Sequence, residues 1–169
     1  MSCTASLTGS PALRNTLGCE AQLASRTTTR AGAATTLPDS SELLFDASVF
    51  IAAEAGRQLA RRPAGRARVS VVTLAELRLG VLRSDGALRE LREATLSFAR
   101  RFVPLAVTES VADELAGLLA KLRASERRAK AFDCFVAATA LAHELVVVTQ
   151  DVDFETLRAA EPRLAVEVV

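Results

Sequence analysis

The sequence contains very few of the residues that build histidine- or cysteine-based sites. Its single histidine is His143, and its three cysteines are Cys3, Cys19 and Cys134. One histidine argues against metal sites made of several histidines and against a Ser–His–Asp triad. An odd number of cysteines without a CxxC spacing argues against a disulfide scaffold and a zinc site. We therefore expect a protein of the reducing cytoplasm.

Long uncharged apolar runs are also absent. No stretch reaches about 18 apolar residues, so we expect no membrane-spanning helix and no membrane partner. The formal net charge of +1 by itself indicates neither a nucleic acid nor an acidic partner. Two stretches, residues 57–68 and 121–130, are rich in Lys and Arg. Each is explained by a solvated surface, and each would also suit a phosphate backbone.

The composition divides the chain into two parts. Residues 1–40 are rich in Ser, Thr, Ala and Gly and have few large apolar side chains, so we predict a disordered N-terminal extension. Residues 41–169 show helical and strand periodicity and are long enough for one domain with its own hydrophobic core.

Strand patterns alternate with helix patterns along this second part. Apolar runs predict strands at 43–45, 69–73, 102–107, 145–148 and 165–169, of which the third is weakened by a proline. Helical spacing of apolar residues predicts helices after the first strand and over 74–81, 88–98, 111–122 and 135–141. The alternation predicts an α/β fold with a central, mainly parallel sheet of about five strands covered by helices on both faces.

Four acidic residues stand at the ends of these elements. Asp46 and Asp151 follow apolar strands, Glu76 lies in the first turns of the helix after the strand 69–73, and Asp133 comes just before the apolar helix. In parallel α/β sheets, binding sites form outside the carboxyl ends of the strands. We therefore expect the four carboxylates to share one site.

Each acid also has an ordinary structural explanation. Asp46 and Asp133 could be helix N-caps, Glu76 a surface helix residue, and Asp151 a turn residue. The four together favour a shared site, because they interrupt otherwise apolar segments. A charge buried beside such segments is costly unless a cation joins it.

Electrostatics selects the cation. Carboxylates about 5 Å apart repel by about 3 kcal/mol per pair at an effective dielectric constant of about 20. Four ionised carboxylates would then cost on the order of 20 kcal/mol, which exceeds the stability of a typical domain. Either some acids stay protonated or a divalent metal lies among them. All-oxygen ligation favours Mg²⁺ or Mn²⁺ over Zn²⁺, and such sites commonly perform phosphoryl chemistry.

Three segments together resemble a known family. FDASVFIA (45–52), SVVTLAELRLGV (70–81) and FDCFVAATALAHELVVVTQDVDF (132–154) are similar, in order, to the motifs of PIN-domain ribonuclease toxins of the VapC family. The resemblance covers roughly residues 42–169. The chain departs from the family in its extension before about Ser41 and in Phe132, where many members have a small or polar residue.

The resemblance implies a three-layer PIN-like fold and a Mg²⁺- or Mn²⁺-dependent endoribonuclease. It also implies a homodimer and a cognate antitoxin, as in a type II toxin–antitoxin system. The metal-binding and catalytic acids that it implies are Asp46, Glu76, Asp133 and Asp151.

Three further residues are candidates for a supporting role around the metal ligands. Ser48 and Thr149 are candidate hydroxyl partners of a carboxylate or of water, although helix capping and strand packing explain them equally well. Asp153 precedes a short helix and is expected mainly as its N-cap, accepting a hydrogen bond from the backbone N–H near Thr156, with a supporting role at the metal as the alternative.

Other protein classes that place acids at strand ends fit the sequence less well. A receiver domain would need a lysine beyond its last strands, and no lysine follows Lys130. A haloacid-type phosphatase would need an aspartate at the position of Ser48. The alternative from another class is a non-catalytic PIN-like module that binds an antitoxin or RNA. The number of metal ions and the RNA target stay open.

Overall fold

The fold is built around a single parallel β-sheet. The computed structural model describes residues 42–61 and 63–169, so the extension predicted over residues 1–40 lies outside the described part. In the described part the sheet has five strands in the order β3-β2-β1-β4-β5, and all neighbours are parallel. The strands are β1 (Glu42–Phe45), β2 (Arg66–Ser70), β3 (Pro104–Leu105), β4 (Val146–Thr149) and β5 (Val166–Val168). The predicted sheet is confirmed.

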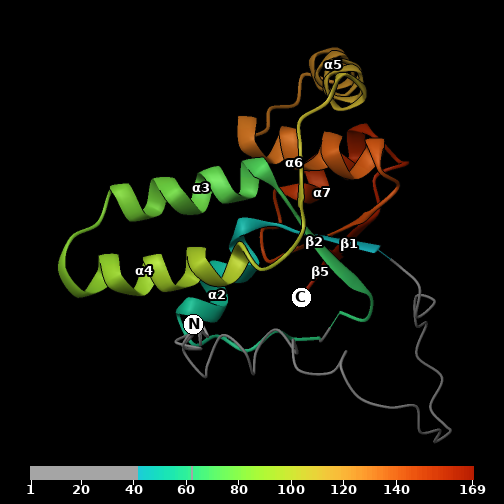
Figure 1. Cartoon of the computed structure of the whole chain (residues 1–169). Coiled ribbons are helices and arrows are strands. Elements are labelled where there is room, and N and C mark those ends of the chain that lie inside the picture. Colours follow the sequence, from blue (N-terminus) through green and yellow to red (C-terminus); the bar gives the residue numbers. More distant parts are fainter. Residues whose placement is uncertain (1–41, 62) are drawn as a thin grey trace, which may run out of the picture.

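Helices connect the strands and cover the sheet (Figure 1). They are α2 (Ala47–Glu54), α3 (Val71–Leu82), α4 (Gly86–Ala99), α5 (Glu109–Ala124), α6 (Ala131–Ala142) and α7 (Phe154–Ala160). The antiparallel pair α3 and α4 extends away from the sheet on one side, and α5 lies outermost above α6. Among the described residues, no helix combines the length and the apolar character needed to cross a bilayer.

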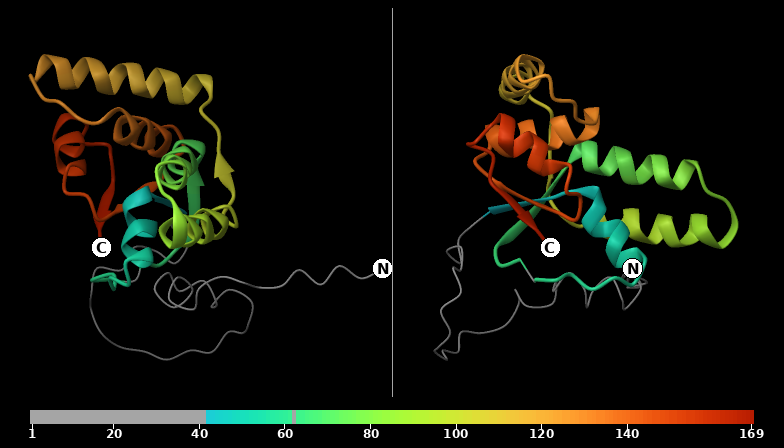
Figure 2. Two further views of the ribbon diagram at one scale, coloured as in Figure 1. Left: turned by 90° about the vertical axis from the view of Figure 1, so that its left-hand side faces the viewer. Right: turned by 180° about the vertical axis from the view of Figure 1, so that it is seen from behind.

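Two apolar clusters separate the layers. Successive residues of β1 face opposite sides: Leu43 and Phe45 belong to one cluster and Leu44 to the other. The first cluster is completed mainly by α2, α3 and α4, with Phe50 fully buried, and the second by α5, α6 and α7, with Phe154 fully buried. Figure 2 shows the sheet between these two groups of helices. The expected three-layer arrangement is therefore confirmed.

The boundary between β2 and α3 differs from the prediction. The apolar run predicted a strand over 69–73, whereas β2 ends at Ser70 and α3 begins at Val71. The Ser70 hydroxyl accepts a hydrogen bond from the backbone N–H of Val72 at 3.1 Å and so caps the helix. The Thr73 hydroxyl donates to the carbonyl oxygen of Phe45 at 3.3 Å. Capping and this tertiary contact override the β propensity of the run.

The start of α6 also differs. The helix begins at Ala131 and not near Cys134, so Asp133 lies inside its first turn, and the N-cap position belongs to Lys130. The expectation that Asp133 precedes the helix, and its alternative explanation as an N-cap, are both wrong. The charged Asp133 interrupts the apolar pattern at this end, which is why periodicity placed the start too late.

The remaining elements agree in kind with the predictions. The helix patterns over 88–98 and 111–122 correspond to α4 and α5, and the strands predicted over 145–148 and 165–169 correspond to β4 and β5. His143 is the C-cap of α6. The strand predicted over 102–107 shortens to β3 because Pro104 cannot donate to the ladder.

Candidate metal centre

The four predicted acids lie at the carboxyl edge of the sheet. Asp46 follows β1, and Asp151 follows the adjacent strand β4, two residues beyond Thr149. Glu76 comes from α3 and Asp133 from α6, two helices that lie side by side above this edge (Figure 1). The negative charges of Asp46, Asp133 and Asp151 all raise the pKa of Glu76. The four carboxylates are therefore near enough to interact electrostatically.

Asp46 is held by two hydrogen bonds and is almost fully buried, with 4% of its surface exposed. Its Oδ2 accepts from the backbone N–H of Ser48 at 3.1 Å and from the hydroxyl of Thr149 at 3.1 Å. The first bond makes Asp46 the N-cap of α2. The capping explanation is therefore confirmed, and the same bonds fix the orientation of the carboxylate at the candidate site.

The hydroxyls of Ser48 and Thr149 form a short chain of hydrogen bonds that ends at the carboxylate of Asp46. Their oxygens are 3.1 Å apart. Because Thr149 gives its single hydrogen to Asp46, Ser48 is the donor in this pair. The backbone N–H of Gln150 donates to Ser48 Oγ and that of Asp151 to Thr149 Oγ1, both at 2.9 Å. These hydrogen bonds thus fix the start of the β4–α7 loop against the start of α2.

Asp133 and Glu76 are unfavourable places for a negative charge. Asp133 is 6% exposed, and its buried Oδ2 has no hydrogen-bond partner among the described residues. Burial, and next the charge of Asp46, raise the pKa of Asp133 to about 6. Burial, and next the charges of Asp46 and Asp133, raise the pKa of the half-buried Glu76 to about 7. A cation at this edge would relieve both groups.

Asp153 belongs to the same acidic group. One carboxylate oxygen each of Asp133, Asp151 and Asp153 lie within 4.8 Å of one another. Asp153 occupies the N-cap position of α7, but its side chain makes no capping hydrogen bond. The N–H of Thr156 donates instead to the backbone oxygen of Asp153, at 3.0 Å. The expected side-chain cap is therefore wrong, and Asp46, Glu76, Asp133, Asp151 and Asp153 together are called the acidic cluster below.

Lys130 is a basic residue that no sequence pattern connected with these acids. Its Nζ is 2.8 Å from Oδ2 of Asp151 and 2.8 Å from Oδ2 of Asp153. The hydrogen bond from Lys130 lowers the pKa of Asp151. The one signal in the sequence was its place, three residues before Asp133 and as the last lysine of the chain.

The donor set of the acidic cluster fits a hard divalent cation. All candidate ligand atoms are carboxylate oxygens, which Mg²⁺ and Mn²⁺ prefer. The unpartnered oxygen of Asp133 belongs to a side chain that lies in the same close group as Asp151 and Asp153. Asp133 and Asp151 belong to both the predicted ligand set and this close group, while Asp46 and Glu76 line the same edge.

A cavity of about 440 Å³ adjoins the acidic cluster between α2, α3 and α4. Glu76 is among its lining residues, so the cavity borders this member of the cluster. Apolar Ile51 and Leu79 and basic Arg83 and Arg92 also line it. A partner segment that carries both apolar and charged groups would fit this lining.

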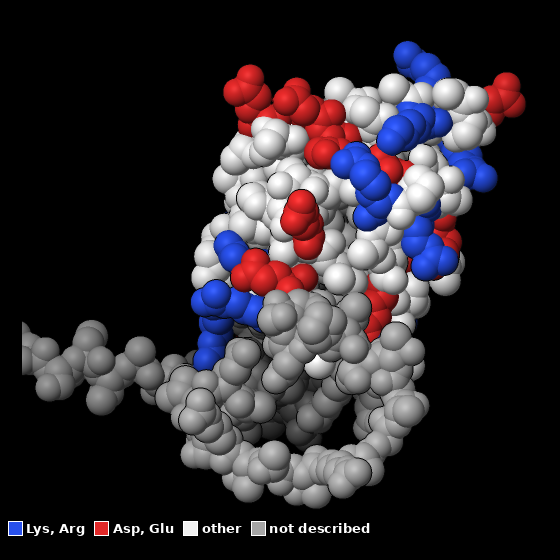
Figure 3. Space-filling view, turned by 90° about the vertical axis from the view of Figure 1, so that its right-hand side faces the viewer, with Lys and Arg blue, Asp and Glu red and all other residues white. Residues whose placement is uncertain are grey.

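The two basic stretches are partly neutralised by ion pairs. In the first, Arg61 pairs with Glu167 and Arg68 with Glu42. In the second, Lys121 pairs with Glu161 and Lys130 with Asp151 and Asp153. Figure 3, viewed from the side opposite α3 and α4, shows acids at one end of the upper rim, where α5 lies, and Lys and Arg at the other. The charges on this face are therefore mixed, and the ion pairs of Arg61 and Arg68 favour a solvated surface for the first stretch.

Comparison with known proteins links these features to one family. The PIN domain family model matches residues 43–160 of the sequence. Ribonuclease VapC4 from Mycobacterium tuberculosis (strain H37Rv) is 45% identical over 120 residues, which are 70% of this chain and 92% of that protein. Ribonuclease VapC5 from the same organism is 43% identical over 120 residues, which are 69% of this chain and 88% of that protein.

A solved structure agrees in fold. The crystal structure of VapBC-5 from Mycobacterium tuberculosis, a member of the VapBC family of toxin-antitoxin systems, matches with a TM-score of 0.65 and 36% sequence identity. The match covers 76% of this chain and 98% of that chain.

Proposed function

The chain belongs to the PIN domain family, and from this premise we propose that it is a Mg²⁺-dependent endoribonuclease, with Mn²⁺ as the alternative metal, acting as the toxin of a type II toxin–antitoxin system. It would hydrolyse RNA phosphodiester bonds. The relatives that are named ribonucleases support the reaction class.

The observation that carries the proposal is the buried, unpartnered oxygen of Asp133 inside the acidic cluster. Five carboxylates at one edge of the sheet are expensive unless a cation compensates them. A divalent ion bound to carboxylates acts as a Lewis acid on phosphate and lowers the pKa of an attacking water. Asp133 and Asp151 would hold that ion, and Asp153 is close enough to contribute. Glu76 would close the site from α3.

Asp46 contributes an orientation fixed before any ligand binds. The N–H of Ser48 and the hydroxyl of Thr149 hold its Oδ2; Ser48 lies in the first turn of α2, and Thr149 ends the buried strand β4. A carboxylate that is already oriented loses little further freedom when it meets a cation or a metal-bound water.

A cleavage assay with total cellular RNA tests the proposal. We expect Mg²⁺-dependent cleavage that EDTA abolishes and that Asp133→Asn lowers by a factor on the order of 10² or more. Asp113→Asn, an exposed position on α5, is the matched control and should cleave like the wild type. Mapping the new RNA ends would identify the target sequence. RNA binding without cleavage in metal-replete buffer would favour the non-catalytic module instead.

The proposed antitoxin partner would occupy the cavity beside Glu76. The related VapBC-5 structure is that of a toxin–antitoxin system, which supports a partner of this kind. Sequence periodicity alone does not distinguish apolar residues of the core from apolar residues that line this cavity. Ile51 and Leu79, exposed by 43% and 41%, are the apolar side chains available to a partner in this cavity. Growth arrest on expression of the chain alone, relieved by a co-expressed antitoxin, is the expected result.

The resemblance also supports a homodimer in the cytoplasm. Sedimentation equilibrium of the purified chain would test the dimer, and cell fractionation would test the location. A monomer at micromolar concentration would contradict the first expectation.

A further inference from the structure

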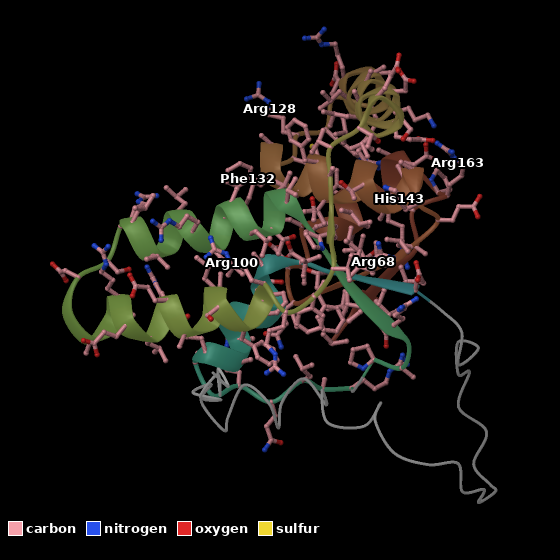
Figure 4. All side chains as sticks on the ribbon, viewed as in Figure 1. Arg68, Arg100, Arg128, Phe132, His143 and Arg163 are labelled. Atoms are coloured by element: carbon pink, nitrogen blue, oxygen red, sulfur yellow. The ribbon has the colours of Figure 1, made fainter. Side chains whose placement is uncertain are left out.

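Lys130 brings a positive charge from the chain itself to the acidic cluster. It stands at the N-cap position of α6, at the end of the connection from α5. Figure 4 labels Arg128 and Phe132, which flank this position at the end of α6 nearest α3. From here the Lys130 ammonium pairs with both Asp151 and Asp153 at 2.8 Å.

The two paired carboxylates form a close group with Asp133. Oxygens of Asp133, Asp151 and Asp153 lie within 4.8 Å of one another. The ammonium has no hydrogen bond to Asp133 among the described residues, and Asp133 Oδ2 is buried there without a partner. The lysine therefore pairs directly with two members of the group. Its charge opposes the rise in the pKa of Asp133 but leaves Oδ2 of that residue without a hydrogen bond among the described residues.

We propose that Lys130 is a tethered counter-cation that competes with the divalent metal for Asp151 and Asp153. The inference rests on the proposed metal site. In the metal-free protein the ammonium holds these two carboxylates together. A bound metal would neutralise these carboxylates in place of the ammonium. Lys130 would then move away from them toward solvent.

The side chain of Lys130 suits this exchange. It is 62% exposed, and its ammonium is a flexible point charge that water readily hydrates once released. Asp151 and Asp153 are 29% and 52% exposed, so the pairs are screened and individually weak. Lys130 therefore lowers the metal affinity without closing the site.

Titration with Mn²⁺ alone, followed by calorimetry, tests the competition. Two weak ion pairs correspond to about a fivefold to tenfold change in a dissociation constant. We expect Lys130→Gln to bind Mn²⁺ more tightly by about this factor. Lys130→Arg keeps the charge and should bind like the wild type. Arg128→Gln removes a nearby exposed charge that makes no contact with the cluster, and it should change the affinity less than twofold.

Thermal unfolding provides a second readout. Without metal, Lys130→Gln should melt below the wild type, because its carboxylates repel without compensation. In saturating Mn²⁺ the difference should disappear. An unchanged or weaker Mn²⁺ affinity in Lys130→Gln, or a shift as large in Arg128→Gln, would overturn the competition. Absence of Mn²⁺ binding by the wild type would instead overturn the proposed metal site.

Discussion

At the scale of single residues, a carboxylate at this site serves structure and chemistry together. Asp46 caps α2 and accepts from Thr149 through one oxygen, Oδ2. Capping and metal binding are therefore compatible, since a carboxylate offers several lone pairs. Asp133 differs, because its buried Oδ2 has no partner in the described part of the chain. Asp46 thus contributes a carboxylate of fixed orientation, and Asp133 contributes a buried carboxylate oxygen without a hydrogen bond.

Glu76 should destabilise the metal-free protein at alkaline pH. Burial raises its pKa to about 7, so the folded state favours the protonated form. The cost is absent below the unfolded value of about 4.5 and grows as pH rises toward 7. At pH 8 in EDTA, Glu76→Gln should therefore be more stable by about 1 kcal/mol, allowing for partial exposure. Urea unfolding measures this, and a less stable variant would show that Glu76 has a compensating partner.

At the scale of elements, the β4–α7 loop contains two aspartates with different structural roles. Oδ1 of Asp151 accepts from the N–H of Asp153 at 2.9 Å, within the turn. Asp153 makes no capping bond and contacts Lys130 from an exposed position. The turn therefore depends on Asp151, whereas the sequence predicted the main structural role for Asp153.

Substitution of the two aspartates should reveal this difference. We expect Asp151→Ala to cost about 1 kcal/mol of stability, since it removes an acceptor for a backbone N–H. Asp153→Ala should stay within about 0.5 kcal/mol of the wild type. Chemical denaturation in EDTA measures both values. A larger loss in Asp153→Ala would mean that its side chain does cap α7 in solution.

The packing of α5 against α7 includes a buried acid far from the acidic cluster. Glu161 is 3% exposed and pairs with Lys121 of α5 and with Arg163, which also pairs with Glu114 of α5. Arg163 is labelled in Figure 4 at the opposite end of α6 from Phe132. The hydrogen bond from Arg163, then that from Lys121, lowers the pKa of Glu161 to about 2.

This lowered pKa predicts an acid-sensitive link between the helices. Its contribution is fully present above the unfolded value of about 4.5 and is lost as pH falls toward about 2. Glu161→Gln should therefore lose about 1–2 kcal/mol at pH 7, a range that allows for the exposed partners. The difference from the wild type should shrink between pH 4.5 and pH 3. Urea titrations at several pH values check this, and a constant difference would assign the loss to packing.

At the scale of the whole molecule, the described residues form two apolar clusters, one on each face of the sheet. Both lie within residues 43–169 and enclose the sheet from its two faces. A chain that begins at Ser41 should therefore keep its melting temperature and its cleavage activity. Calorimetry and the RNA assay check this. Loss of folding would show that the extension packs against the domain.

The sequence determined the sheet and the place of its acids. Apolar runs that end in Asp46 and near Asp151 mark two strand ends, and parallel strands bring their carboxyl ends to one edge. The predicted starts of two helices placed Glu76 and Asp133 near the same edge, although Asp133 lies inside α6 and not before it. Local periodicity and chain direction are enough to decide the strand ends.

Only the tertiary structure decided the contacts around the acids. Lys130 reaches Asp151 and Asp153 because α6 starts beside the β4–α7 loop, and no local pattern encodes that proximity. Asp153 joins the acidic cluster for the same reason. Side-chain partners separated by some 20 residues depend on how helices pack, whereas strand ends depend on the local sequence. The sequence therefore predicts the site, and the fold determines which charges compensate it.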